Sequence, residues 1–221
     1  GERVRTYLLA HPEVLREVAR KLDEKDAAAA QAHKVAEVAK IQAKLPQFRA
    51  AIEHDPRDFV ANPGGKITLT QFYDYHCPYC KSIAPSIVEI IRSNPDVRVV
   101  FKEAVIFGPK SEHAAAAALA VKASGGDYLG FYEAMMKADA KTDADVDALA
   151  LAHGATAANL KSPQLAQASR QQILDTQNLF RNIGLEGTPG YVIGDTVIPG
   201  AYLQDLSIAI AEARGRRPLA Q

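Results

Sequence analysis

Both cysteines of the chain lie in one short stretch, "YHCPYC", in which two residues separate Cys77 from Cys80. Thiols at this spacing can bind a metal ion, form a structural disulfide or exchange disulfides with another protein. A structural zinc site uses four ligands, and the sequence contains no second CxxC and no HxxxH pair. A structural disulfide across two residues would close a very small loop and constrain the unfolded chain little. The pattern therefore favours a redox-active thiol pair.

The two thiols lie where a predicted strand meets a predicted helix. Residues 66–75, "KITLTQFYDY", alternate and are rich in β-branched and aromatic residues, which predicts a strand, and residues 81–94 have apolar side chains at helical spacing. At the start of that helix, unpaired N–H groups and the helix dipole would lower the pKa of Cys77 below its ordinary value of about 8.5. We expect Cys77 to be the exposed nucleophile and Cys80, one turn later, the shielded resolving thiol.

Three neighbours of the thiols are candidates for tuning their reactivity. His76 directly precedes Cys77, and its imidazole either favours the thiolate or is simply a solvent-exposed side chain. Pro78 suits the first helical turn, because the N–H that it lacks would be unpaired there. We expect Pro78 and Tyr79 to tune the redox potential, in a direction that the sequence does not determine.

A second feature lies far along the chain, where "EGTPGYVIG" places Thr188-Pro189 at the start of a predicted strand. A central strand tolerates proline only at its first residue or at a bulge. We predict a cis bond here, which would present the backbone of Thr188 beside the thiols, where an extended substrate can add as a further strand. The alternative is an ordinary turn proline.

Hydrophobic periodicity and turn residues predict the other strands and helices of the domain that contains the thiols. Residues 66–107 form a strand, a helix and a strand, so we expect the two strands to pair in parallel. Residues 109–184 predict about four helices, and residues 190–200 predict a hairpin that turns at Gly194-Asp195. An amphipathic helix closes the chain. Residues 53–65 contain two prolines and two glycines and predict a loop.

The N-terminal segment, residues 3–45, is predicted to be helical and amphipathic. We expect a short helix, a break at His11 and then a long helix that begins at Pro12. Its first apolar row consists of Val14, Leu15, Val18 and Leu22. A single helix cannot bury such a row by itself, so the segment packs either on its own domain or on a copy of itself.

Composition excludes several classes of protein. The 221 residues are 48% hydrophobic and carry a formal net charge of zero, so no strong basic field indicates nucleic acid as a partner. No apolar run approaches the roughly 20 residues that a membrane span needs, and no signal peptide is visible. We therefore expect neither nucleic acid nor membrane as a partner.

Taken together, a strand, a CxxC, a helix with Pro85 five residues after Cys80, a helical insertion and a Thr-Pro before a hairpin resemble the thioredoxin superfamily. The insertion resembles that of the bacterial DsbA-like thiol–disulfide oxidoreductases. The segment "YLLAHPEVL" resembles the N-terminal extension of one subfamily, the suppressor-of-copper-sensitivity C proteins. Glutaredoxins share the CPYC motif but are much smaller and lack the insertion.

The resemblance implies an α/β protein with a thioredoxin fold and an inserted helical domain. The extension would occupy residues 1–60 as an oligomerisation segment with its linker, and the DsbA-like catalytic domain residues 61–221. Within that domain, the thioredoxin fold would comprise 63–108 and 185–221, and the insertion 109–184.

The resemblance also implies an activity. Cys77 and Cys80 would be the catalytic pair and Pro189 the cis-proline after Thr188, at which substrate binds. We expect a periplasmic disulfide isomerase or reductase that acts on misfolded or disulfide-bonded proteins. It would assemble through residues 3–45, as a trimer in preference to a dimer, and would be reduced by a membrane thiol reductase.

Two other activities remain open. One is a DsbA-like dithiol oxidase, which needs no oligomer. The other is a copper-binding protein whose redox activity is secondary, because two closely spaced thiolates suit Cu(I). No cofactor is required for thiol exchange itself, and bound Cu(I) would use the same Cys77 and Cys80.

One position departs from the family pattern. Many thioredoxins and DsbA-like enzymes have a buried acid six residues before the first cysteine, where this chain has Gln71. An amide cannot relay protons, so any relay must come from water or from another group. Asp74 and Glu103 are the candidates, although charged residues at strand ends are commonly solvated.

Overall fold

The computed structural model describes residues 1–215, which divide into two compact units. The first unit is Gly1–Lys40 and the second begins at Ile41. This boundary differs from the one expected at residue 60. The reason is that Ile41, Leu45 and Ile52, near the end of the long helix, are buried in a core of the second unit.

The first unit is helical throughout. Helix α1 (Glu2–Ala10) ends before His11, and α2 (Pro12–Glu53) begins at the next residue, which confirms the short helix, the break and the long helix. No residue of Gly1–Lys40 is buried. Of the predicted apolar row, Leu15, Val18 and Leu22 are 52%, 57% and 55% exposed, and Val14 is half-buried. The three exposed residues are called the apolar row from here on.

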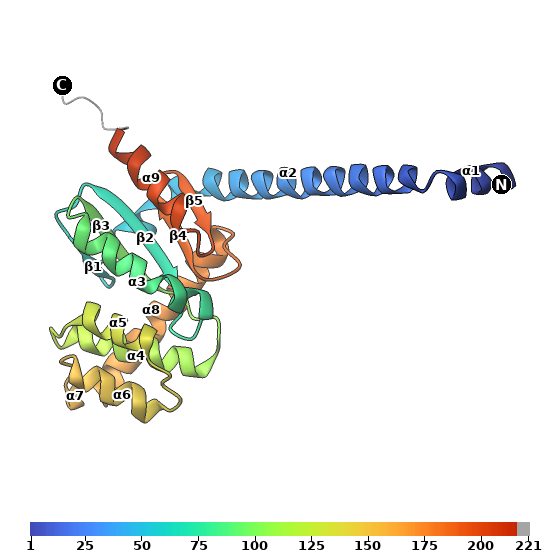
Figure 1. Ribbon diagram of the computed structural model, residues 1–221. Coiled ribbons are helices and arrows are strands. Elements are labelled where there is room, and N and C mark those ends of the chain that lie inside the picture. Colours follow the sequence, from blue (N-terminus) through green and yellow to red (C-terminus); the bar gives the residue numbers. More distant parts are fainter. Residues whose placement is uncertain (216–221) are drawn as a thin grey trace, which may run out of the picture. The chain divides into compact units, whose positions relative to one another are not determined.

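The second unit is built on a five-stranded mixed sheet with the strand order β1-β3-β2-β4-β5 (Figure 1). The predicted parallel pairing of β2 with β3 and the predicted β4–β5 hairpin are both confirmed. The short strand β1 lies in the segment expected to be a loop, and it forms because its backbone pairs antiparallel with β3. The strands are β1 (Phe59–Ala61), β2 (Ile67–Tyr73), β3 (Val97–Glu103), β4 (Gly190–Ile193) and β5 (Thr196–Pro199).

Both faces of the sheet are covered, and side chains alternate between them. Leu69 and Tyr73 of β2 join the larger core, together with side chains of α3 (Pro78–Ser93) and α9 (Leu203–Gly215). Phe72, between them, joins a second core with the end of α2 and with α8. Burial on both faces fixes the register of β2, because a slip of one residue would exchange the two sets of side chains.

The helical insertion lies between β3 and β4 and contains five helices rather than about four, because one of them is a single turn. In Figure 1, α4 to α7 gather beside the sheet, and the long α8 leads back to it. None of the described helices is both long enough and apolar enough to cross a membrane. The helices are α4 (Pro109–Ala123), α5 (Tyr128–Lys137), α6 (Asp143–Ala152), α7 (Ala157–Leu160) and α8 (Pro163–Asn182).

A carboxylate is buried in the larger core, where β3 meets α5. Glu103, only 2% exposed, accepts hydrogen bonds from the hydroxyls of Tyr128 and, at 3.5 Å, Tyr73. Tyr73 also contacts Tyr75 and Tyr128 through its hydroxyl, at 3.0 and 2.8 Å. Burial raises the pKa of Glu103 to about 7, with the nearby charge of Asp58 adding to the effect. The folded protein therefore binds a proton at Glu103 more tightly than the unfolded chain does.

We predict that replacing Glu103 with Gln makes stability less dependent on pH. In the native protein, the Glu103 proton is present in the folded state but absent from the unfolded state between the unfolded pKa of about 4.5 and the folded value of about 7. Folding stability must then fall as pH rises through this window, by at most about 3 kcal/mol from this group. Melting temperatures at pH 5 and pH 8 should differ less for Glu103→Gln than for the native chain. An unchanged difference would contradict the buried titration.

Candidate active site

The end of β2 and the start of α3 bring the two thiols together. Cys77 is the N-cap of α3 and Pro78 its first residue, as predicted, and Cys80 lies one turn along. Both thiols are buried, at 2% and 1% exposure. The expectation that Cys77 is exposed was therefore wrong. Its Sγ turns toward the chain before β4 and lies 3.2 Å from the carbonyl oxygen of Thr188.

The environment separates the acidities of the two thiols. The pKa of Cys77 is lowered to about 6, chiefly by a hydrogen bond from Cys80. The Thr188 side chain and the backbone N–H groups of Cys80 and Tyr79 lower this pKa further, whereas burial raises it. Burial and the bond to Cys77 raise the pKa of Cys80 far above its ordinary value. At pH 7, Cys77 is therefore mostly thiolate. Cys77 is thus the group able to attack a disulfide, and Cys80 waits as a thiol.

The predicted cis bond between Thr188 and Pro189 is confirmed. The Thr188 hydroxyl is buried and has no hydrogen-bond partner among the described residues. It is the Thr188 side chain that helps to lower the pKa of Cys77. The Cys77 thiol donates to the Thr188 carbonyl oxygen, and the Thr188 side chain favours the thiolate, so this one residue contacts the sulfur and lowers its pKa.

His76 is held by a chain of hydrogen bonds that sequence reasoning did not find. The Ser111 hydroxyl donates to Asp74 Oδ1 at 2.6 Å, so its oxygen is free to accept from His76 Nδ1, 3.2 Å away. This fixes the proton of the neutral imidazole on Nδ1. Ser111 lies 35 residues along the chain from His76 at the start of α4, and no local pattern indicates it. Tyr79, in contrast, is 67% exposed.

The two acids proposed as proton relays are both buried rather than solvated. Asp74 binds Ser111 and the backbone N–H groups of His76, Ile106 and Phe107, and so ties the end of β2 to the chain after β3. Glu103 accepts from the tyrosine hydroxyls. The hydrogen bonds of both carboxylates are thus used elsewhere. Gln71, which stands at the family's acidic position, is 1% exposed and donates to the hydroxyl of Tyr132 at 2.9 Å.

Among residues 1–215, no group of three or more His, Cys, Asp or Glu side chains is arranged to hold a metal ion. The two thiols remain as a pair of soft ligands within hydrogen-bond reach of each other. Such a pair fits Cu(I), which takes thiolates at low coordination number, and does not fit a four-ligand zinc site.

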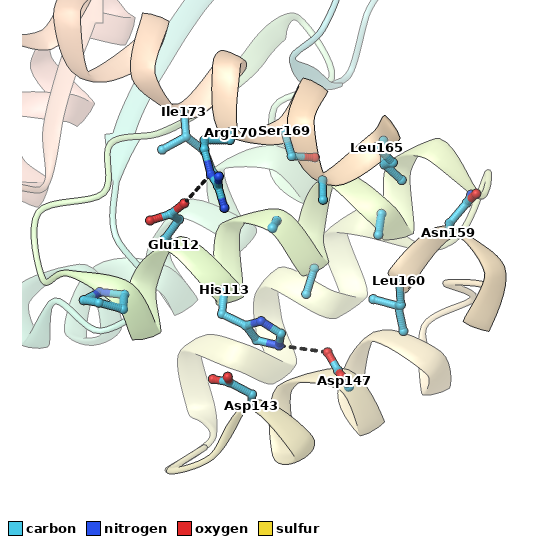
Figure 2. A pocket seen from close by; sticks show the side chains of 15 residues that line it. Glu112, His113, Asp143, Asp147, Asn159, Leu160, Leu165, Ser169, Arg170 and Ile173 are labelled. Carbon is cyan, nitrogen blue, oxygen red and sulfur yellow. Dashed lines mark hydrogen bonds and ion pairs between the residues drawn. The ribbon is translucent and has the colours of Figure 1, made fainter. Parts of the chain in front are cut away.

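A separate pocket of about 370 Å³ lies in the helical insertion between α4, α6, α7 and α8 (Figure 2). Four of its polar side chains form two pairs, in which Arg170 contacts Glu112 at 3.2 Å and His113 contacts Asp147 at 2.9 Å, and Asp143 also lines it. None of its lining residues belongs to the thiol site. The pocket is therefore separate from the thiol chemistry of the chain.

We predict that Thr188→Val raises the pKa of Cys77 by about one unit, because the variant keeps the shape of the side chain but loses a hydroxyl donor to the thiolate. Thiolate absorbance of the reduced protein, followed against pH, measures the midpoint. Thr68→Val, on β2, is the matched control and should leave the midpoint near 6. A Thr188→Val midpoint equal to that of the native chain would refute the hydroxyl's role.

The chain matches two protein families. Residues 68–207 match the DSBA-like thioredoxin domain, and residues 1–29 match the N-terminal domain of the copper resistance protein ScsC. Among curated proteins, no significant match is found.

Three solved structures illustrate the similarity. ScsC from Proteus mirabilis, in a transitional conformation, is 28% identical over 97% of this chain and 94% of its own, with a TM-score of 0.71. The thiol–disulfide exchange protein α-DsbA2 from Wolbachia pipientis is 26% identical over 80% of this chain and 97% of its own, with a TM-score of 0.73. A periplasmic thioredoxin-like protein from Salmonella enterica serovar Typhimurium is 31% identical over 76% of this chain and 97% of its own, with a TM-score of 0.69.

The family match covers well over half of the chain and includes both thiols and the cis-proline. It agrees with the mixed sheet, the inserted helices and the difference in acidity between Cys77 and Cys80. The chain belongs to the DsbA-like thioredoxin-domain family of thiol–disulfide oxidoreductases, and it carries the N-terminal domain of ScsC proteins.

Proposed function

We propose that this oxidoreductase is a disulfide isomerase or reductase for secreted or periplasmic proteins, and that it acts as a homo-oligomer. The observation that carries the proposal is the uncovered apolar row of the first unit, Leu15, Val18 and Leu22, each more than half exposed. An oxidase that works as a monomer has no use for such a row. An isomerase gains from presenting several thiol pairs to one misfolded substrate, by effective concentration.

The side chains of the first unit support association with copies of itself. The row has spacings of three and four residues, which place it on one face of α2. Elsewhere on α2, ion pairs join Lys21 to Glu17 at 2.8 Å and Lys40 to Glu37 at 2.6 Å. A helix with one apolar face and paired charges elsewhere is typical of a seam between helices. A trimer is favoured over a dimer on the family resemblance.

The chemistry of Cys77 suits this role. With its pKa lowered to about 6, Cys77 is mostly thiolate at neutral pH, and an isomerase starts its reaction with a thiolate that attacks a wrong disulfide. The pair must then be kept reduced, so we propose a membrane thiol reductase as its partner. A periplasmic location follows from the same family, one member of which is described as periplasmic.

Cu(I) binding is a second candidate function, supported by the match to the ScsC N-terminal domain and by the paired thiols. Copper would use Cys77 and Cys80 as ligands and would therefore block thiol exchange. Stoichiometric Cu(I) should slow alkylation of Cys77, and Cys80→Ser should abolish tight binding. If alkylation proceeds at an unchanged rate with Cu(I) present, the thiols are not the copper ligands.

The main test compares the full chain with a variant that lacks residues 1–40. We expect the shortened chain to be a folded monomer, because Ile41 and Leu45 stay within its core, and we expect light scattering to give an oligomer for the full chain. The reduced full chain should reactivate scrambled ribonuclease, and the monomer should not. Fast oxidation of reduced ribonuclease without reactivation would instead indicate a dithiol oxidase.

Two full-length variants test whether the apolar row itself, rather than the presence of the N-terminal helix, is needed for assembly. Leu15→Gln, Val18→Gln and Leu22→Gln together should give a monomer with the activity of the shortened chain. Arg16→Gln with Lys25→Gln changes the same helix but leaves the row intact, and should keep the oligomer and its activity. A triple variant with the mass of the native oligomer would show that the row is not the interface.

A further inference from the structure

The pocket of about 370 Å³ in the helical insertion has an apolar floor (Figure 2). Helix α4 lines it with Ala116, Ala117 and Ala120, whose side chains are too small to fill the space between α4 and α8. Pockets of roughly 300–1,000 Å³ that combine an apolar lining with a few polar groups are the usual binding sites for small molecules. The pocket therefore has room for a small organic molecule.

A buried hydroxyl without a partner lies on the wall that α8 forms. Ser169 is 2% exposed, and its hydroxyl has no hydrogen-bond partner among the described residues. Ser169 follows Leu165 by four residues and precedes Ile173 by four, and both of these residues also line the pocket. Residues at this spacing share one face of a helix, so Ser169 belongs to the face of α8 that lines the pocket.

Ser169 differs in its bonding from other helical serines of the chain. Serines in helices commonly donate to the carbonyl oxygen four residues earlier. Ser207 donates to Leu203 at 3.0 Å, and Ser124, at the end of α4, donates to Ala120 at 2.8 Å. The Ser169 hydroxyl makes no such bond, and a buried hydroxyl that stays unpaired lowers stability. A molecule bound in the pocket, with a polar atom at its buried end, would supply the missing partner.

Acidic side chains are in excess around the pocket. Of the three carboxylates that line it, those of Glu112 and Asp147 are in the two pairs described above. Asp143 has no ion-pair or hydrogen-bond partner among the described residues, and it is exposed. With His113 neutral, three carboxylates and one guanidinium leave the lining with two negative charges in excess. Figure 2 shows Asp143 on the α6 side of the pocket and Ser169 on the α8 side.

These features select one class of ligand. A carboxylate or a phosphate would meet the excess of negative charge, and a bare metal ion would find no group of three or more ligating side chains among the described residues. An ammonium group carries a positive charge and donor hydrogens, which suit an exposed carboxylate. An apolar body attached to that ammonium group would cover the alanine floor and gain from leaving water.

We propose that this pocket binds a small organic amine with an aromatic body. Its ammonium group lies at Asp143, its ring covers Ala117 and Ala120, and a hydroxyl at its far end bonds to Ser169. The site is separate from the thiols, so the proposal goes beyond the proposed function and does not depend on it.

Tyramine is the probe, because it combines an ammonium group, an aromatic ring and a phenol hydroxyl. Two relatives each lack one group: 2-phenylethylamine has no hydroxyl, and 4-ethylphenol has no ammonium group. In titrations of the full-length chain followed by NMR spectroscopy, tyramine should have the smallest Kd, and the Kd of 4-ethylphenol should be at least fivefold larger. Equal Kd values for tyramine and 4-ethylphenol, or no binding of tyramine, would overturn the proposal.

Variants of Asp143 test the ammonium end. Asp143→Asn should raise the Kd of tyramine about fivefold, because the unpaired charge is lost, and should leave that of 4-ethylphenol unchanged. Asp205→Asn is the matched control, since it removes an acid from the first turn of α9 instead of α6, and it should change neither value. A native Kd for tyramine in Asp143→Asn would contradict the assignment.

A variant of Ser169 tests the hydroxyl end. Ser169→Ala should raise the Kd of tyramine about fivefold but leave that of 2-phenylethylamine unchanged, because this probe has no hydroxyl to lose. A general loss of the pocket's shape would instead weaken both probes equally, and that result would refute the contact with Ser169.

The location of the probe is a separate readout. Tyramine should shift the amide signals of α4, α6 and α8 and leave those of α3, which carries the thiols, in place. Shifts confined to α3 would place tyramine at the thiols and overturn the proposal. None of these measurements depends on oligomer formation or thiol exchange, so a failure of the ribonuclease test would leave this proposal standing.

Discussion

The structure of the site depends on the burial of strand β2 on both faces. Because side chains alternate along a strand, Phe72 must enter one core while Gln71 and Tyr73 enter the other. This register decides where β2 ends and therefore where Cys77 starts the next helix. It also sets Gln71 opposite Tyr191 on the face that carries the thiols.

The two sulfurs owe their different acidities to position rather than to residue type. Cys77 lies at the N-terminus of α3, where backbone N–H groups and the Cys80 thiol donate to it, so that its thiolate is favoured despite burial. Cys80 lies one helical turn further along α3, donates a hydrogen bond to Cys77 and is buried in the larger core. Thiol exchange requires such a division between an attacking thiolate and a waiting thiol.

The N-terminal unit, in contrast, leaves apolar side chains uncovered. The catalytic unit buries most of its large apolar side chains in its own cores, whereas Leu15, Val18 and Leu22 have nothing to pack on within Gly1–Lys40. One helix cannot shield such a row from water, so the free energy of covering it is available for association. The same chain thus combines a self-sufficient catalytic unit with a segment that is incomplete alone.

The sequence by itself determined the thiol pair, its place between a strand and a helix, the inserted helices, the hairpin and the cis-proline, because spacing, periodicity and turn residues are local signals. Tertiary structure alone decided the rest. Strand β1 forms only because β3 pairs with it. The boundary between the two units lies after Lys40 rather than at residue 60, because Ile41 and Leu45 pack in a core with residues far along the chain. Cys77 is covered by Thr188, and Ser111 binds His76, through contacts that span 111 and 35 residues. Contacts at such separations leave no periodic trace in the sequence, since they depend on how the sheet assembles.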